Sequence, residues 1–220
     1  MALLEMKEVT FSAGEVTPVK DVSISIEEGT VTAFLGTPGS GKSTVLKLLA
    51  GLITPTHGKI LYNEKDIFSL TKKETLAFRK RAAFMFQDSA LWANQDIFHN
   101  LELPLQIHFP NMSPKEKKDR IEEITNLIGY HKPLTNRPAA LSIGEQKRIG
   151  FARTLICQPD ILFLDEPTES LDEATVELFV SILKTFCEQK KTLIYVSHDS
   201  DFIRTFNGTR HIFYNGEQRK

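Results

Sequence analysis

The 220-residue chain has few of the features that mark secreted, metal-scaffolded or membrane-spanning proteins. Its two cysteines, Cys157 and Cys187, stand in separate, partly apolar segments with a helical pattern. We interpret both as reduced packing residues of a cytosolic protein rather than as a disulfide or a metal pair. The sequence shows no signal peptide and no apolar run near the roughly 18 residues of a membrane span. If the protein acts at a membrane, we expect another chain to supply the spanning part.

An excess of charge of one sign is also lacking, because the formal net charge is −1. Proteins that bind nucleic acid usually carry a basic field, so no nucleic-acid partner is expected. The content of 41% hydrophobic and 25% charged residues is ordinary for a globular protein. The length suits one large domain, or one domain with a subdomain, and we see no internal repeat or low-complexity tract.

The most specific stretch is a glycine-rich loop between an apolar run at 31–35 and a helical pattern at 45–51. Glycines let backbone N–H groups turn toward an anion, and the helix N-terminus adds partial positive charge. In such a loop Lys42 reaches the β- and γ-phosphates, and the Ser43 hydroxyl ligates Mg²⁺. The alternative is a glycine-rich turn with a surface lysine, but the flanking strand and helix favour a nucleoside triphosphate site. The loop residues are Gly36, Thr37, Pro38, Gly39, Ser40, Gly41, Lys42, Ser43 and Thr44.

Strand and helix patterns alternate through most of the chain. Apolar residues at every second position, Val22, Ile24 and Ile26, predict an early strand, and the stretch 4–11 suggests another before it. The alternation predicts an α/β fold with a mainly parallel sheet and helices on both faces. Further strands are expected at 59–62, 82–86, 160–164, 192–196 and 210–214, and helices at 72–80, 144–157, 173–188 and 199–205.

The character of the chain changes between Asp88 and about Pro138. Apolar residues recur there at helical spacing, and we interpret the prolines at 104, 110, 114, 133 and 138 as breaks between helices. We therefore predict an inserted helical subdomain at about 88–138, within a single domain whose core covers about 1–87 and 139–220.

Acidic residues stand where a buried strand ends. Four apolar residues, 161–164, lead directly into Asp165 and Glu166, and the strand at 192–196 leads to His198. Ligands of open parallel sheets bind at this carboxyl edge. Asp165 is expected to hold Mg²⁺, Glu166 to orient and deprotonate water, and His198 to contact the γ-phosphate. The alternatives are that the acids are turn formers and that the histidine is structural.

A second possible anion site begins at Ser142, far along the chain from Lys42. Ser142 has the character of a helix N-cap, with a small residue, Gly144, in the first turn. Alone, this pattern is only a capping motif.

Taken together, these motifs resemble the nucleotide-binding subunit of ABC transporters, over essentially the whole chain and in that family's order and spacing. The resemblance implies a P-loop NTPase core with an antiparallel β subdomain, and it implies ATP hydrolysis with Mg²⁺. The corresponding segments are the Walker A loop 36–44, the Q-loop glutamine Gln87, the signature 141–145, the Walker B strand 161–166, the D-loop 170–172 and the H-loop His198.

The resemblance also implies roles for individual residues. Glu166, His198 and Gln87 are catalytic; Ser43, Gln87 and Asp165 bind the metal. The Walker A loop, Ser142, Gly144, Glu145 and Asp172 bind nucleotide, and Phe11 matches the aromatic residue that stacks on adenine, although packing is an alternative for it. The signature departs from the family in Ile143, which replaces a glycine, and in Glu145, which replaces a glutamine.

In this family two subunits pair head to tail around ATP, so the resemblance implies a homodimer with Lys42 and Ser142 of different copies on one nucleotide. It also implies a transmembrane permease partner and a peripheral position on the inner, cytoplasmic face of the cell membrane. The segments 84–92 and 101–105 resemble Mla-type phospholipid transporters, and the length equally resembles lipoprotein-release and macrolide-export subunits. The alternative is a non-transport ATPase that signals to cell-envelope or division machinery.

The only tryptophan, Trp92, lies between a predicted strand and a predicted helix, just after Gln87. We predict that the stretch 89–98 forms the groove that contacts the permease. The alternative is that Trp92 is a buried packing residue of the helical subdomain.

Overall fold

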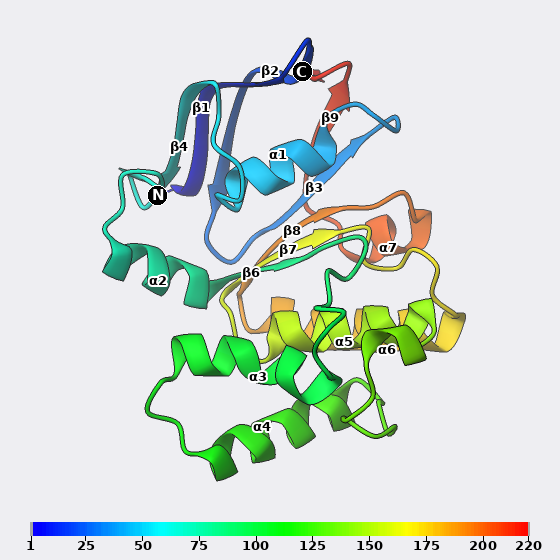
Figure 1. The fold of residues 1–220 in the computed structure, drawn as a ribbon. Helices are drawn as coiled ribbons and strands as arrows, with labels where there is room; N and C mark the ends of the chain where they lie inside the picture. The colour runs from blue at the N-terminus through cyan, green and yellow to red at the C-terminus, as the bar shows by residue number, and fades with distance from the viewer. Residues whose placement is uncertain (1, 220) are drawn as a thin grey trace.

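The computed structural model describes residues 2–219 and contains two sheets with helices packed around them (Figure 1). The strands are β1 (Ala2–Ala13), β2 (Val16–Glu27), β3 (Val31–Gly36), β4 (His57–Tyr62), β5 (Lys65–Asp66), β6 (Ala82–Met85), β7 (Ile161–Asp165), β8 (Thr192–Val196), β9 (Thr209–Tyr214) and β10 (Glu217–Arg219). The helices are α1 (Lys42–Leu49), α2 (Lys72–Arg81), α3 (Ile97–His108), α4 (Pro114–Leu127), α5 (Ile143–Leu155), α6 (Glu173–Glu188) and α7 (Ser200–Thr205), with a 3₁₀ turn at Pro138–Ala140.

The larger sheet has the strand order β10-β9-β3-β8-β7-β6, and all its pairs are parallel except β9 with β10. The smaller sheet, β2-β1-β4-β5, is antiparallel. The predicted α/β fold with a P-loop NTPase core and an antiparallel β subdomain is therefore confirmed. Strand β10 follows β9 after a short turn and was not expected from the sequence.

The central strands are apolar along their whole length because each of their faces meets a different core. On β7, Ile161 and Phe163 belong to the core shared with α1 and the antiparallel sheet, whereas Leu162 and Leu164 belong to the core shared with α3–α6. Side chains alternate between the faces of a strand, so a strand covered on both faces loses the polar alternation. Helices accordingly cover both faces of the sheet (Figure 1).

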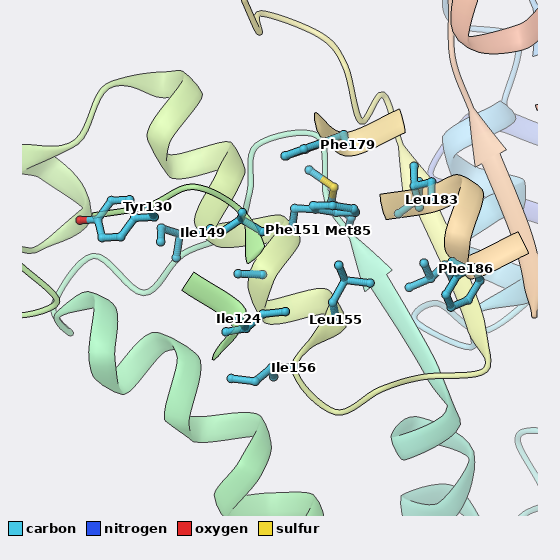
Figure 2. Close-up of a cluster of buried hydrophobic side chains, with 14 of the residues drawn as sticks. Met85, Ile124, Tyr130, Ile149, Phe151, Leu155, Ile156, Phe179, Leu183 and Phe186 are labelled. Atoms are coloured by element: carbon cyan, nitrogen blue, oxygen red, sulfur yellow. The ribbon is translucent and has the colours of Figure 1, made fainter. Parts of the chain in front are cut away.

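The core shared with α3–α6, which we call the second core, joins the segment 88–138 to the rest of the chain. Ile124 of α4 and Tyr130 lie in the same buried cluster as Met85 at the end of β6 (Figure 2). In this cluster the ring of Phe151 on α5 stacks on Phe179 of α6, with ring centroids 4.0 Å apart. The predicted division at 88 and 138 remains a prediction, although α3 and α4 do fall within it.

Proline positions were partly misinterpreted. Pro104 lies inside α3, which runs unbroken from Ile97 to His108, so the expected break at 104 is wrong. Leu101 and Leu105, on the flanking turns, are fully buried in the second core, and this packing keeps the helix continuous despite the missing N–H. Pro114 instead occupies the first turn of α4, as predicted, behind the N-cap Ser113.

The helix expected at 144–157 ends earlier, because α5 stops at Leu155 and Cys157 lies in the turn that follows. Cys157 and Cys187 are both unpaired and half-buried, and burial raises the pKa of each thiol to about 11. Both cysteines are therefore protonated packing residues near neutral pH. Among residues 2–219, no helix combines the length and apolarity that a membrane crossing needs.

Candidate nucleotide site

The loop 36–44 joins β3 to α1. At two positions its backbone adopts a conformation that only glycine can take. Gly36 and Gly41 have φ angles of 142° and 97°. A Cβ on Gly36 would lie 2.1 Å from the Phe213 carbonyl oxygen, and one on Gly41 would lie 2.1 Å from the Pro18 carbonyl oxygen. The loop can therefore curl tightly against its neighbours. The buried Ser40 hydroxyl has no hydrogen-bond partner within the described chain, as fits a loop built around a polar ligand.

Lys42, at the start of α1, bends back over the loop. Its Nζ donates hydrogen bonds to the carbonyl oxygens of Gly36 at 3.0 Å and Thr37 at 2.8 Å. The side chain is buried, and this desolvation lowers the Lys42 pKa, whereas the charges of Glu166 and Asp165 act to raise it. A buried ammonium held by two neutral carbonyl groups gains strongly from a phosphate anion nearby.

The oxygen donors expected to hold Mg²⁺ are brought together. The Ser43 hydroxyl donates a 2.7 Å hydrogen bond to Oδ1 of Asp165, and both residues line a hollow of about 380 Å³ with Gln87. Within residues 2–219 no cluster of three or more His, Cys, Asp or Glu side chains is placed to hold a metal ion. One carboxylate with hydroxyl and amide oxygens fits Mg²⁺, which usually takes its remaining ligands from water and nucleotide phosphates.

Glu166, directly after β7, is fixed from two sides. Its N–H donates to the Val196 carbonyl oxygen at 3.0 Å, and its Oε2 accepts a 3.1 Å hydrogen bond from the His198 N–H. The His198 Nε2 lies 3.4 Å from Glu166 Oε1. Burial raises the Glu166 pKa, and its backbone adopts a left-handed φ of 48°. A largely buried carboxylate on a left-handed backbone in a cleft is typical of a functional group.

Lys42, Ser43, Gln87, Glu166 and His198 share one pocket of about 460 Å³ at the carboxyl edge of the parallel strands, and the hollow with Asp165 adjoins it at Ser43 and Gln87. A larger cavity of about 640 Å³ lies between α4 and α6, but none of the predicted nucleotide residues lines it. The structure therefore brings the Walker A loop, the predicted catalytic residues and the metal donors to one place. The pocket is lined by Pro38, Gly39, Lys42, Ser43, Gln87, Glu166, Thr168, Glu169, Val196, His198 and Asp199.

The signature residues do not line this pocket. Ser142 is the N-cap of α5 and accepts a hydrogen bond from the Glu145 N–H, while the Glu145 carboxylate accepts from the Ser142 N–H. The carboxylate also lies 2.6 Å from Lys132 Nζ, and this pair is the main reason for the lowered Glu145 pKa. Ile143 is 70% exposed in the first turn beside Gly144. Glu145 is thus engaged within its own chain.

Two further predicted residues also lie outside the pocket wall. Asp172 is the N-cap of α6 and accepts hydrogen bonds from the Thr175 N–H and hydroxyl. Phe11 lies on β1 opposite Val19 and packs, partly buried, against the core of the antiparallel sheet. Their nucleotide-binding roles remain predictions.

Sequence reasoning missed three residues around Glu166. Glu169 lines the pocket and accepts a 2.8 Å hydrogen bond from Gln87 Nε2, and Lys147 Nζ donates to the Glu169 carbonyl oxygen at 2.7 Å. Thr168 also lines the pocket and donates to Asp199. The sequence did offer one signal for Thr168 and Glu169, because they follow closely after Asp165 and Glu166 at the end of a predicted strand. Lys147, a single lysine within α5, gives no comparable signal.

Trp92 is 49% exposed, so the alternative of a buried packing residue is wrong. The Asn100 side chain bonds the Trp92 backbone N–H and carbonyl groups and so fixes the loop that carries the indole. Trp92 lines a groove of about 430 Å³ with Phe84, Phe86 and Pro104. We call this hollow, between β6 and α3, the Trp92 groove.

Comparisons with known proteins agree with this geometry. The profile of the family described as ABC transporter matches residues 19–169. Methionine import ATP-binding protein MetN 2 of Enterococcus faecalis is 37% identical over 93% of this chain and 60% of its own length. ABC transporter ATP-binding protein YtrE of Bacillus subtilis is 34% identical over 85% of this chain and 81% of its own.

Among solved structures, the dimeric ATP-binding cassette MJ0796 in a post-hydrolysis state with ADP and Pi has a TM-score of 0.90 and 31% identity. That similarity covers 99% of this chain and 97% of MJ0796. The chain spans about 60% of the length of the methionine import relatives. Sequence profile, relatives and fold agree, and the chain therefore belongs to the ABC transporter family, of which it carries the ATP-binding domain.

Proposed function

We propose that this chain is the ATP-hydrolysing subunit of an ABC transporter and powers a separate membrane permease. The observation that carries the proposal is the placement of Glu166 and His198 in the same pocket as Lys42 and Ser43. Membership of the ABC transporter family supports ATP as the nucleotide. The fold of MJ0796, solved with ADP and Pi, supports hydrolysis as the reaction.

In this proposal each group has one task. The loop N–H groups and the Lys42 ammonium hold the β- and γ-phosphates, since both complement negative charge. Glu166 takes a proton from the attacking water, and its raised pKa suits a base better than that of an exposed carboxylate would. His198 holds the Glu166 side chain in place through its N–H and contacts the γ-phosphate through its ring.

The metal proposal rests on the donor set of Ser43, Asp165 and Gln87. When bound there, Mg²⁺ neutralises charge on the phosphate oxygens. The Ser43 hydroxyl, which now donates to Asp165, would present its lone pairs to the ion, and Asp165 would hold the ion directly or through water.

A second copy of the chain completes the site. Ser142, Gly144 and Glu145 lie outside the pocket formed by Lys42 in the same chain, and MJ0796 was solved as a dimer. The first turn of α5 leaves backbone N–H groups free for an anion, because Ser142 caps only the Glu145 N–H. We assign this turn to the γ-phosphate of the partner's ATP, with Asp172 at the interface and Phe11 on the adenine.

The permease contact is assigned to the Trp92 groove. A half-exposed tryptophan in a hollow lined by apolar side chains, with basic residues such as Arg79 and Arg153 among them, is the kind of surface that another protein covers. The groove is next to Gln87, so nucleotide binding and permease movement have a short physical connection. In this arrangement the chain sits on the inner face of the membrane without entering it.

The phospholipid cargo expected from 84–92 and 101–105, and the lipoprotein cargo expected from the chain length, are not supported by the relatives named methionine import proteins. In the structure Trp92 and Pro104 line the groove and Leu101 and Leu105 are core residues, so these segments serve docking and packing rather than cargo recognition. Cargo choice is therefore assigned to the permease.

The test is phosphate release from ATP by the purified chain, with Mg²⁺ and with EDTA. Turnover that needs the metal supports the proposal. Absence of turnover both alone and with the permease in detergent would contradict it.

A further inference from the structure

The Gln87 side chain is oriented by a residue with no assigned role. Its Nε2 donates a 2.8 Å hydrogen bond to Glu169 Oε2 in the wall of the nucleotide pocket. An ionised carboxylate can only accept hydrogen bonds, so the amide atom that faces Glu169 must be the nitrogen. The amide oxygen is then the atom left free, and it is the atom that a hard cation such as Mg²⁺ prefers.

Glu169 is itself held in place by α5, the helix that begins in the signature segment 141–145. Lys147 of α5 is 2% exposed, and its Nζ donates a 2.7 Å hydrogen bond to the Glu169 carbonyl oxygen. Burial lowers the Lys147 pKa, and the carboxylates of Glu169, Glu166 and Asp165 act in the opposite direction by stabilising the charged ammonium. A buried cation with such partners keeps one geometry, because moving it leaves the charge without compensation.

Arg148, the residue after Lys147 on α5, fixes the other end of the segment 169–175. Arg148 donates to the Thr175 hydroxyl, and Thr175 is bound to the N-cap Asp172. Consecutive side chains of α5 therefore hold both ends of the segment 169–175. The position of Glu169 is set by a rigid helix rather than by the loop alone.

We propose that Glu169, held by Lys147, is a positioning residue that turns the Gln87 amide so that its oxygen faces the metal of the nucleotide site. The inference rests on the proposed function, because it assumes that Gln87 is a metal ligand. Partners in the shell behind a metal ligand commonly set metal affinity by fixing ligand orientation.

The test uses the Glu166→Gln chain, in which ATP is expected to drive dimerisation without being consumed. The measured quantity is the Mg²⁺ concentration that gives half-maximal dimer in light scattering. Adding Glu169→Ala should raise this concentration about tenfold, as is typical for the loss of such a partner. Glu177→Ala, which removes an exposed carboxylate on α6, is the matched control and should leave it unchanged.

A double-mutant comparison separates positioning from direct ligation. In a Gln87→Ala background, Glu169→Ala should have no further effect, because there is no amide left to orient. An equal effect in both backgrounds would mean that Glu169 meets the metal itself and would overturn the proposal. An unchanged Mg²⁺ requirement in Glu169→Ala would overturn it as well.

Lys147 is tested in the same assay. Lys147→Met should also raise the Mg²⁺ concentration that gives half-maximal dimer. Lys147→Arg keeps the charge and a hydrogen-bond donor, so it should bring this concentration most of the way back to that of the Glu166→Gln chain. Melting temperatures check that each variant folds. If Lys147→Met does not fold, the Glu169 arm still decides the proposal, since Glu169 is exposed.

A separate measurement distinguishes failure of this inference from failure of the proposed function. Mn²⁺ affinity of the ATP-loaded chain, measured by electron paramagnetic resonance, needs neither dimer nor turnover. Weaker Mn²⁺ binding in Glu169→Ala supports the inference even if the parent does not dimerise. Equal Mn²⁺ binding in parent and variant contradicts the inference, whatever the state of the dimer.

Discussion

The Ser43 hydroxyl donates a 2.7 Å hydrogen bond to Asp165, which lies 122 residues further along the chain. The contact joins the first turn of α1 to the end of β7 and brings together two oxygen groups that we propose as Mg²⁺ ligands. Ser43→Ala removes one of them, so the Mg²⁺ concentration needed for half-maximal ATP turnover should rise about tenfold or more. A Mg²⁺ titration at saturating ATP measures this. Ser69→Ala, an exposed serine far from the site, should titrate like the parent.

The second prediction concerns the signature in trans. In a Glu166→Gln background, Ser142→Arg should abolish ATP-driven dimers, because the larger side chain fills the space that faces the phosphate. Ser113→Arg is a matched control, since Ser113 has the same capping box with Glu116 on α4. It should cost about 1 kcal/mol of stability and leave dimerisation intact. Dimers that persist in Ser142→Arg, seen by light scattering, would refute the assignment in trans.

The third prediction concerns the Trp92 groove. Trp92→Ala should weaken assembly with the detergent-solubilised permease about thirtyfold, as at an interface hot spot. Because the indole is already half-exposed, the variant should lose only about 1 kcal/mol of stability. Leu127→Ala, an exposed apolar residue on α4, should bind normally. Normal permease binding by a folded Trp92→Ala chain would place the contact elsewhere.

The fourth prediction follows from three helix caps. Lys65 and Thr71 lower the Glu74 pKa to about 2, and the pKa values of Glu116 and Glu145 are also lowered by their partners. The unfolded chain therefore binds these protons more tightly, and the stabilisation is lost as the pH falls from about 4.5 toward about 2. Urea midpoints measured across this range should fall, and Glu74→Gln should make the fall shallower. Equal slopes would contradict the assignment.

The sequence predicted the parts of the fold in which local pattern and tertiary packing agree. The run 161–164 predicted a buried strand because both faces of β7 are covered, and β8 and α6 were predicted with their observed bounds. The apolar residues Met6 and Val9 break strict alternation on β1, yet both are buried, because a register shift with a left-handed Glu8 lies between them. A bulge of this kind depends on pairing with β2 and β4.

The candidate site was predicted where one motif carries its own chemistry, as the loop 36–44 does. Residues whose roles depend on distant partners were missed. A charged Lys147 gives no sign in the sequence of its burial, or of its bond to the Glu169 carbonyl oxygen 22 residues further along. The role proposed for Glu169 likewise depends on its contact with Gln87, which lies 82 residues earlier in the chain. Pro104 shows the reverse case, in which packing overrides a strong local signal.

The central claim is that this chain hydrolyses ATP with Glu166 as the base. The most direct measurement compares turnover and ATP binding in the parent and in Glu166→Gln, which keeps size and hydrogen bonding but removes the basic carboxylate. The account predicts turnover lower by about 10²-fold or more, with ATP binding retained. Glu177→Gln, at an exposed position on α6, is the control. Parental turnover in Glu166→Gln would contradict the account.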